Sequence, residues 1–348
     1  MKITRLLQFI FTFTILFAVS CSSDDEITQE IYYGNGFLLT NEGNFGKPNA
    51  DVTFVSSDLS LKQDNIFSSN NGGSNLGDVL QTIVFNGENA YLVLNNTNKI
   101  QIVNRYNFKS TGEITNQINQ PRYMAFANNN IYVTNDKYGG EKYVSIYKAA
   151  DLSFVKKISF SSTDAAERVV AAGNNIFVQN ASYGYGNKIT YINTSTNDVQ
   201  ATINLPNGNI NKIISDSQNV YAIAAGTSDS YIYQISASGS ITKTITLTGV
   251  SKATNLEIEK GKFYFTSGNN VYTMDMNATA APTSPLFTVA NSVDQYSNLY
   301  GFNVVDGKIF TSDANGFTQD SKISVYNTSG SIIKTFTAGK ATNGFYKN

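Results

Sequence analysis

The stretch Asn130-Ile131-Tyr132-Val133-Thr134-Asn135 decides the fold, because copies of it recur along the chain. Each copy has a polar turn rich in Asn and Gly, then an apolar-aromatic-apolar run, then a small polar end. Alternation with a period of two between polar turns is the pattern of a β-strand. The central residues of the seven copies are Leu38, Tyr91, Tyr132, Phe177, Tyr221, Tyr264 and Phe310.

The spacing of the copies predicts the architecture. Successive central residues are 53, 41, 45, 44, 43 and 46 positions apart. Such a repeat has room for four short strands, which is typical of one β-propeller blade. Third and fourth strands are visible after the copies, for example Val144-Ser145-Ile146-Tyr147 and Phe154-Val155-Lys156-Lys157-Ile158. We therefore predict an all-β fold, a single seven-bladed β-propeller over residues 31–348, with no helix.

The two ends of the repeat array are unequal. The first unit begins almost at its second strand, whereas Ala341-Thr342-Asn343-Gly344-Phe345-Tyr346 follows the fourth strand of the last unit. We predict that this C-terminal strand supplies the missing strand and closes the ring, which leaves only short protected edges.

Residues 1–20 have the features of a signal peptide. Lys2 and Arg5 precede an apolar run of 14 residues, which is short for a membrane span. The sequence Ala18-Val19-Ser20-Cys21 resembles a lipobox, although leucine is usual at the position of Ala18. The resemblance implies cleavage before Cys21 and lipidation of that residue. A plain signal peptide with an incidental cysteine is the alternative.

Residues 21–30 are interpreted as the lipidated cysteine and a flexible tether. The run Ser22-Ser23-Asp24-Asp25-Glu26 resembles the acidic signal that directs some lipoproteins to the cell surface, and an ordinary solvated tether is the alternative. Several acyl chains on one cysteine hold a protein stably on a bilayer. The expected location is the outer membrane, lipid-anchored and exposed at the cell surface.

Composition excludes several classes of enzyme. The chain has no histidine and one cysteine, so it cannot form a Ser-His-Asp triad, a His-ligated haem or a disulfide framework. The 25 Lys and Arg balance 26 Asp and Glu, which gives no basic excess for nucleic acid. We predict a non-enzymatic protein without a cofactor. A lyase or a quinone-dependent dehydrogenase is the enzymatic alternative.

Few carboxylates suggest a site. Glu42, Asp78 and Glu167 are isolated in the sequence and are interpreted as solvated loop residues, although two of them could meet across the ring. Asp136 and Asp313 could offer loop oxygens to calcium, but no EF-hand spacing accompanies them. We therefore predict no metal site.

A polar ring is expected at one mouth of the central channel. Counting back nine or ten residues from each central residue reaches the start of the innermost strand of the blade. The residues there are Gln81, Arg122, Arg168, Lys212, Asn255 and Gly301, with Asn343 in the C-terminal strand. Three consecutive blades supply cations, which suit an anionic or hydrogen-bonding ligand. A water-filled mouth with structural hydrogen bonds is the alternative.

The loops that follow the second strands should lie on the same face. They combine glycine with aromatic residues, a composition typical of recognition loops. The loop residues predicted to bind a ligand are Asn41, Glu42, Asn135, Tyr138, Tyr183, Tyr185, Asp313 and Phe317. Aromatic side chains that merely cover the rim of the blades are the alternative.

Several of these segments together resemble the YncE-like surface propeller lipoproteins. They are Asn41-Glu42-Gly43-Asn44-Phe45, Gly77-Asp78-Val79-Leu80-Gln81, Asn95-Asn96-Thr97-Asn98-Lys99-Ile100, Pro121-Arg122-Tyr123 and Tyr132-Val133-Thr134-Asn135. One branch of that family captures cobalamin and passes it to a TonB-dependent outer-membrane transporter. The resemblance implies a corrinoid or another scarce nutrient as ligand and such a transporter as partner. A protein- or glycan-interaction module without a small-molecule ligand is the alternative.

Overall fold

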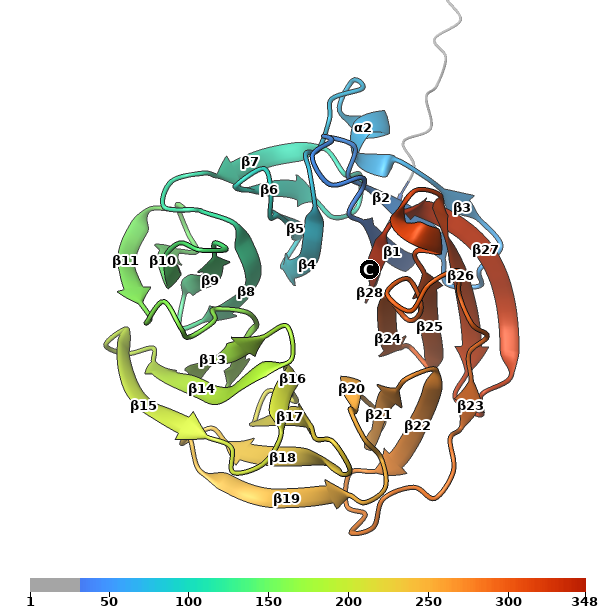
Figure 1. Cartoon of the computed structure of the whole chain (residues 1–348). Coiled ribbons are helices and arrows are strands. Elements are labelled where there is room, and N and C mark those ends of the chain that lie inside the picture. Colours follow the sequence, from blue (N-terminus) through green and yellow to red (C-terminus); the bar gives the residue numbers. More distant parts are fainter. Residues whose placement is uncertain (1–31) are drawn as a thin grey trace, which may run out of the picture. The chain divides into compact units, whose positions relative to one another are not determined.

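The computed structural model describes residues 32–348, which form seven four-stranded antiparallel sheets arranged as a ring of blades (Figure 1). The predicted all-β, seven-bladed propeller is confirmed. Within the described residues, no helix is long and apolar enough to cross a membrane. The predicted signal peptide, Cys21 and the tether up to residue 30 lie outside the described residues.

Each blade has an inner strand at the centre of the ring and three further strands toward the outside (Figure 1). Blade 1 consists of β28 (Thr342–Lys347), β1 (Gly36–Asn41), β2 (Asp51–Ser56) and β3 (Lys62–Gln63). Blade 2 consists of β4 (Leu80–Asn86), β5 (Asn89–Leu94), β6 (Lys99–Asn104) and β7 (Ser110–Ile114). Blade 3 consists of β8 (Pro121–Ala127), β9 (Asn130–Asp136), β10 (Lys142–Lys148) and β11 (Phe154–Ser159). Blade 4 consists of β12 (Val169–Ala172), β13 (Asn175–Ser182), β14 (Tyr185–Asn193) and β15 (Asp198–Asn204).

The remaining three blades repeat this order. Blade 5 consists of β16 (Asn209–Ser215), β17 (Asn219–Ala225), β18 (Ser230–Ser236) and β19 (Ile241–Leu247). Blade 6 consists of β20 (Thr254–Glu259), β21 (Lys262–Ser267), β22 (Asn270–Asp275) and β23 (Phe287–Thr288). Blade 7 consists of β24 (Gly301–Val305), β25 (Lys308–Asp313), β26 (Asp320–Asn327) and β27 (Ile332–Lys340).

The C-terminal strand closes the ring, as the sequence predicts. β28 pairs antiparallel with β1, so that Leu39 lies opposite Phe345. The ring of Phe345 stacks on Phe310 of blade 7 with centroids 5.1 Å apart. One strand therefore completes the first blade by backbone pairing and joins it to the last blade by side-chain packing.

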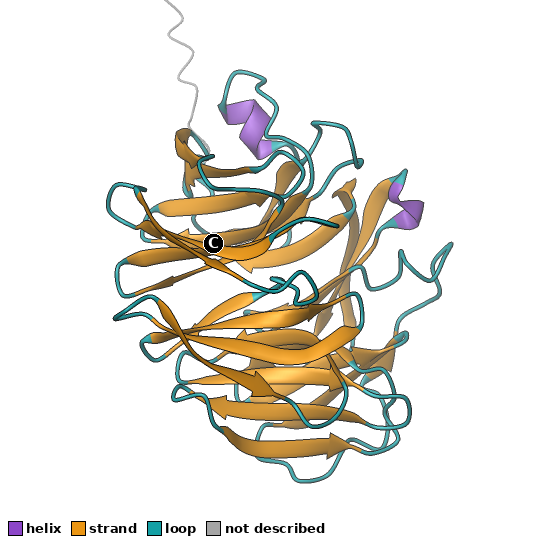
Figure 2. Ribbon diagram, turned by 60° about the vertical axis from the view of Figure 1, so that its left-hand side comes forward, coloured by secondary structure: helices purple, strands orange, loops and turns teal. Residues whose placement is uncertain are grey.

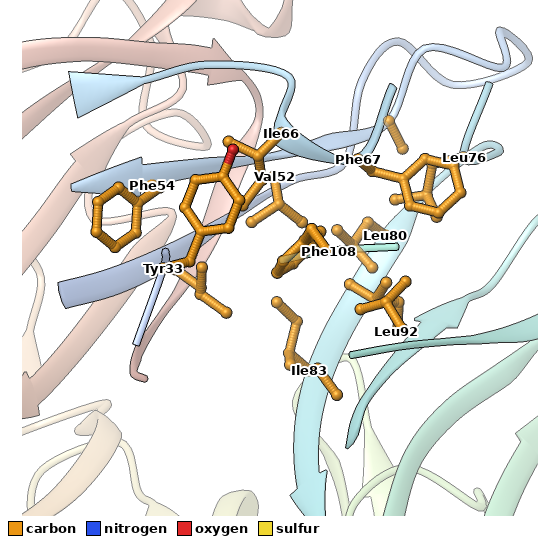
Figure 3. Close-up of a cluster of buried hydrophobic side chains, with 14 of the residues drawn as sticks. Tyr33, Val52, Phe54, Ile66, Phe67, Leu76, Leu80, Ile83, Leu92 and Phe108 are labelled. Atoms are coloured by element: carbon orange, nitrogen blue, oxygen red, sulfur yellow. The ribbon is translucent and has the colours of Figure 1, made fainter. Parts of the chain in front are cut away.

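The hydrophobic core lies between the blades. Each of the seven buried apolar clusters of the described chain joins two neighbouring sheets. In the cluster between blades 1 and 2, Phe54 packs edge-on against Tyr33, and Phe108 and Leu92 lie close by (Figure 3). The second strand of each blade is covered on both faces, which explains why β1 is buried at every position.

Among residues 32–348, two short helices lie in loops (Figure 2), so the prediction of a propeller domain without helix is wrong. α2 (Ile66–Asn70) buries Ile66 and Phe67 against blade 1. Its first backbone N–H groups donate to the carboxylate of Asp51, at 2.9 Å from Phe67 and 3.1 Å from Ser68. The sequence did not predict this helix because five residues are too few to show a helical period. The carboxylate that accepts from its N-terminal N–H groups also belongs to a distant strand, β2. The second helix is the 3₁₀ turn η2 (Asn315–Phe317).

Candidate functional site

One face of the propeller carries both groups of residues that the sequence points to. Inner strands begin where second strands end, as the pairing of Asn41 with Thr342 and of Asn135 with Pro121 shows. We call this side the loop face. β1 begins at Gly36 on the opposite side, so the chain enters the propeller from the face opposite the loop face.

The start of the inner strand is bulged in five blades. The register shifts near the beginning of β28, β4, β8, β16 and β20. A bulge inserts an unpaired residue and turns side chains in new directions. Gln81, Arg122, Asn255 and Asn343 all lie at these bulges.

A cleft of about 750 Å³ lies on the loop face, mainly between blades 3 and 4. Its rim includes Tyr138, Tyr183, Tyr185 and Phe45, whose exposed fractions lie between 79% and 91%. We call it the tyrosine cleft. Aromatic side chains this exposed contribute little to the core, and their rings offer flat apolar contacts to a ligand.

The charged groups of the tyrosine cleft are paired. Lys188 Nζ lies 2.8 Å from Asp164 Oδ1. Lys142 forms an ion pair with Asp136, whose other oxygen accepts the backbone N–H of Ala166 at 2.9 Å. The cleft is thus polar, but the charges of Lys142 and Lys188 are already neutralised by aspartates.

Arg122 is held in place by a carboxylate and an amide. Its Nε and Nη2 donate to the two oxygens of Glu167 at 2.9 and 2.8 Å, and its Nη1 donates to Gln81 Oε1 at 2.7 Å. Burial disfavours its charge, but the carboxylate of Glu167 more than offsets this, and the pKa of Arg122 is raised. The interpretation of Glu167 as a solvated loop residue is wrong, because the next blade brings it against Arg122.

A second cavity of about 450 Å³ lies among the inner strands, and we call it the channel. Gln81, Arg168, Lys212, Asn255 and Asn343 of the predicted ring all line it, whereas Arg122 lines the tyrosine cleft. The Arg122–Gln81 contact therefore stands between the two cavities.

The channel contains one paired and one stacked cation. Lys212 forms an ion pair with Glu257, which also accepts a hydrogen bond from Asn303 Nδ2 at 2.8 Å. Burial lowers the pKa of Lys212, against the effect of Glu257. The guanidinium carbon of Arg168 lies 4.1 Å from the ring centre of Tyr123.

Glu42 forms part of the channel wall rather than a solvated loop. Tyr300 Oη donates to its Oε2 at 2.8 Å, and Asn343 Nδ2 donates to its Oε1 at 2.6 Å. Burial raises the pKa of Glu42 despite these hydrogen bonds, and burial followed by the charge of Glu42 raises the pKa of Tyr300 well above its usual value.

Asp78 is also engaged rather than solvated. Its Oδ2 accepts the N–H of Gly46 at 2.9 Å and the amide of Asn96 at 2.6 Å. Its Oδ1 is buried without a hydrogen-bond partner in the structure. The three carboxylates that look isolated in the sequence thus all lie in contacts between segments that are distant in the chain.

Asn41 and Asn135 have side chains that are occupied by the fold. Asn41 donates to the hydroxyl of Thr53 at 3.0 Å and accepts from Thr342 at 2.7 Å. Asn135 donates to the carbonyl of Val133 at 3.0 Å and accepts the backbone N–H of Asn119 at 2.8 Å. Both are buried, so the structure gives them strand-end roles and brings neither amide to an open cavity surface.

Three further predicted residues have structural contacts. Asn255 Nδ2 donates to the hydroxyl of Thr266 at 3.1 Å at the edge of the channel. Asp313 accepts from Ser292 at 2.5 Å, and the ring of Phe317 packs edge-on against Tyr300 at 4.9 Å. Asp313 and Phe317 line neither the tyrosine cleft nor the channel.

Sequence reasoning missed Glu257, Tyr123, Tyr300 and Tyr346, which all line the channel. Two of them stand beside predicted positions, because Tyr123 follows Arg122 and Glu257 follows Asn255 by two residues. The sequence analysis assigned one channel residue to each blade, and such a count holds only if the inner strands are regular. The bulge in β8 lets Arg122 line the cleft and Tyr123 line the channel from consecutive positions.

Comparison with known proteins identifies a family and a fold. A family model described as Domain of unknown function (DUF5074) matches residues 35–346. No protein with a curated description matches the chain by sequence.

Solved structures resemble the whole propeller. A quinonprotein alcohol dehydrogenase-like protein from Bacteroides thetaiotaomicron has a TM-score of 0.69 and 14% identity, over 91% of this chain and 79% of that one. The dihydro-heme d1 dehydrogenase NirN, in complex with DHE, has a TM-score of 0.55 and 14% identity, over 91% and 76%. The computationally designed Ika8 protein has a TM-score of 0.57 and 8% identity, over 91% and 90%. At such identities the similarity shows the propeller fold alone.

Proposed function

We propose a binding function for this chain, which belongs to the family described as Domain of unknown function (DUF5074): it captures a small molecule in the tyrosine cleft. The observation that carries the proposal is the set of four exposed aromatic rings around one cavity of about 750 Å³. Cavities of this size are typical of small-molecule sites. Rings that are so exposed add little to the stability of the blades, and a ligand would bury them.

The charge pairs in the cleft favour an uncharged ligand. Asp136, Asp164 and Glu167 each already hold a cation, so a charged ligand would have to compete with these pairs. A ring compound that carries amide or hydroxyl groups would stack on the tyrosines and form hydrogen bonds with the polar side chains that line the cleft. A corrinoid, expected from the resemblance to YncE-like propellers, has amide groups around its ring and is the first compound of this class to test.

We further propose that the protein binds rather than catalyses, and that it acts at the cell surface. The chain has no histidine, and the charged side chains of the cleft are engaged with one another. Lipidation at Cys21 would anchor it at the outer membrane, with a TonB-dependent transporter as partner.

Thermal unfolding with a ligand panel tests the proposal. The panel contains cobalamin, cobinamide and neutral oligosaccharides. A ligand at a hundred times its Kd stabilises the folded state by about 2.7 kcal/mol. We expect the triple variant Tyr138→Ala, Tyr183→Ala, Tyr185→Ala to lose this shift.

The matched control is Tyr296→Ala. Tyr296 is an exposed tyrosine that does not line the cleft. It should keep the full shift. A shift that survives the triple variant would contradict the proposed cleft. No shift with any compound, together with binding to a protein or glycan surface, would favour the interaction module.

A further inference from the structure

Arg168 differs from the other two cations of the predicted ring. Arg122 and Lys212 each have a carboxylate partner. Among residues 32–348, the guanidinium of Arg168 has neither a hydrogen bond nor an ion pair, and it lies over the ring of Tyr123. Arg168 lines the channel, and the five N–H donors of its guanidinium have no acceptor from the described chain.

The stack on Tyr123 prepares the guanidinium for a ligand. A ring 4.1 Å away covers one face of the planar group and limits its rotation, while the edges that carry the N–H groups stay free. The fork of donors on such an edge matches two oxygens of a carboxylate or a phosphate. Part of the entropy cost of ordering the side chain is thus met before binding.

Lys212 lies near Arg168, and neither acid of the channel is bonded to Arg168. Lys212 is close enough to Arg168 for the two like charges to disfavour each other, which contributes, after burial, to the lowered pKa of Lys212. Two acids face the channel, and both are bonded elsewhere. Glu257 is held by Lys212 and Asn303, and Glu42 is held by Tyr300 and Asn343. An anion beside Arg168 would relieve the repulsion between the two cations.

We propose that the channel contains an anion site, separate from the tyrosine cleft, at which Arg168 on its Tyr123 platform binds the carboxylate or phosphate group of a small molecule. The channel cavity of about 450 Å³ has room for a small organic anion. The contacts of Arg122 with Gln81 and Glu167 lie between this site and the cleft, so the two sites can be tested separately.

Isothermal titration calorimetry at constant ionic strength tests the site with inorganic phosphate and, in a second arm, with succinate. We expect the wild-type protein to bind one of them, and the arm that gives heat identifies the class of anion. Arg168→Gln should weaken that binding roughly ten- to a hundred-fold, the usual effect of losing hydrogen bonds to a charged group. Arg168→Lys keeps the positive charge but lacks the paired N–H donors of a guanidinium. Its affinity for the anion should lie between that of the wild type and that of Arg168→Gln.

The matched control is Arg105→Gln. Arg105 is also stacked on an aromatic ring, with its guanidinium carbon 4.0 Å from the ring centre of Phe85, but it lies outside the channel lining. Its variant should bind the anion as the wild type does. Equal affinity in wild type and Arg168→Gln, or no heat with either anion at millimolar concentration, would overturn the proposal.

Two checks separate this site from folding and from the proposed function. The thermal midpoint of Arg168→Gln, compared with that of Arg168→Lys, shows whether lost binding reflects lost structure. The triple tyrosine variant of the cleft should retain anion binding. Loss of anion binding in that variant would show that the two cavities form one site and would also overturn the proposal of a separate site.

Discussion

Two of the three cations at the start of the inner strands, Arg122 and Lys212, form ion pairs with the next blade. Arg122 and Glu167 are 45 positions apart in the sequence, and so are Lys212 and Glu257. This distance is one repeat, so each pair joins neighbouring sheets on the loop face. A buried pair gives little net stability, but removing one partner leaves a charge that is both buried and uncompensated.

We therefore expect Arg122→Gln to cost about 3–5 kcal/mol of unfolding free energy, because it strands the carboxylate of Glu167. The double variant Arg122→Gln, Glu167→Gln should be more stable than this single variant, since no buried charge remains. Urea unfolding of both single variants and the double variant measures the coupling. Additive losses would contradict the expectation. The expected loss of stability in Arg122→Gln would also make Arg122 a poorer probe of ligand binding than Arg168.

Glu42 makes the stability of the ring closure depend on pH. Burial raises its pKa in the folded protein above the ordinary value of 4.5, so folding favours the protonated acid. This contribution is complete below the ordinary pKa and is lost as pH rises through the folded pKa. Glu42→Gln cannot ionise, yet it keeps an acceptor for Asn343.

We expect Glu42→Gln to raise the thermal midpoint at pH 7.5 relative to wild type and to change it little at pH 4. Glu88→Gln, at an exposed turn, is the control and should follow the wild type at both pH values. A gain of the same size at both pH values would show that ionisation of Glu42 is not the cause.

Among the elements, β28 connects the first and last blades. Phe345 is 2% exposed and packs against Phe310 of blade 7, whereas its strand pairs with β1 of blade 1. Phe345→Ala should cost about 3–5 kcal/mol, the usual loss for a fully buried phenylalanine. Phe154→Ala, on an outer strand and 38% exposed, should cost clearly less. Chemical denaturation compares them, and equal losses would contradict a special role for the closing strand.

The elements also show where sequence reasoning ends. The second strands could be predicted because both of their faces are buried and their residues are apolar. The closing strand could be predicted because one unit lacked a strand and the tail had one. The bulges could not, because an inserted residue changes the direction of side chains without changing the pattern of residue types.

For the whole molecule, the repeat of about 44 residues was sufficient to predict the number of blades, whereas the candidate site was predicted only in part. The residues of the channel and the exposed tyrosines could be predicted from the position of each residue within its own blade. Partners such as Glu167 and Glu257 belong to the next blade, and their meeting with Arg122 and Lys212 depends on how adjacent sheets are rotated. A pattern read along one strand contains no information on that rotation.

The pairing of β28 with β1 also sets an order of events in the cell. Residues 342–347 form the inner strand of the first blade and are translated after all of its other strands, and Asn348 donates its backbone N–H to the carbonyl of Gly36 at 3.0 Å. A nascent chain can build the middle blades, but Leu38 and Leu39 lack their cover until residues 342–347 have emerged from the ribosome. The closed ring therefore forms only once β28 has been made, and a chain truncated before residue 342 exposes an apolar sheet edge that quality-control proteases and chaperones can recognise.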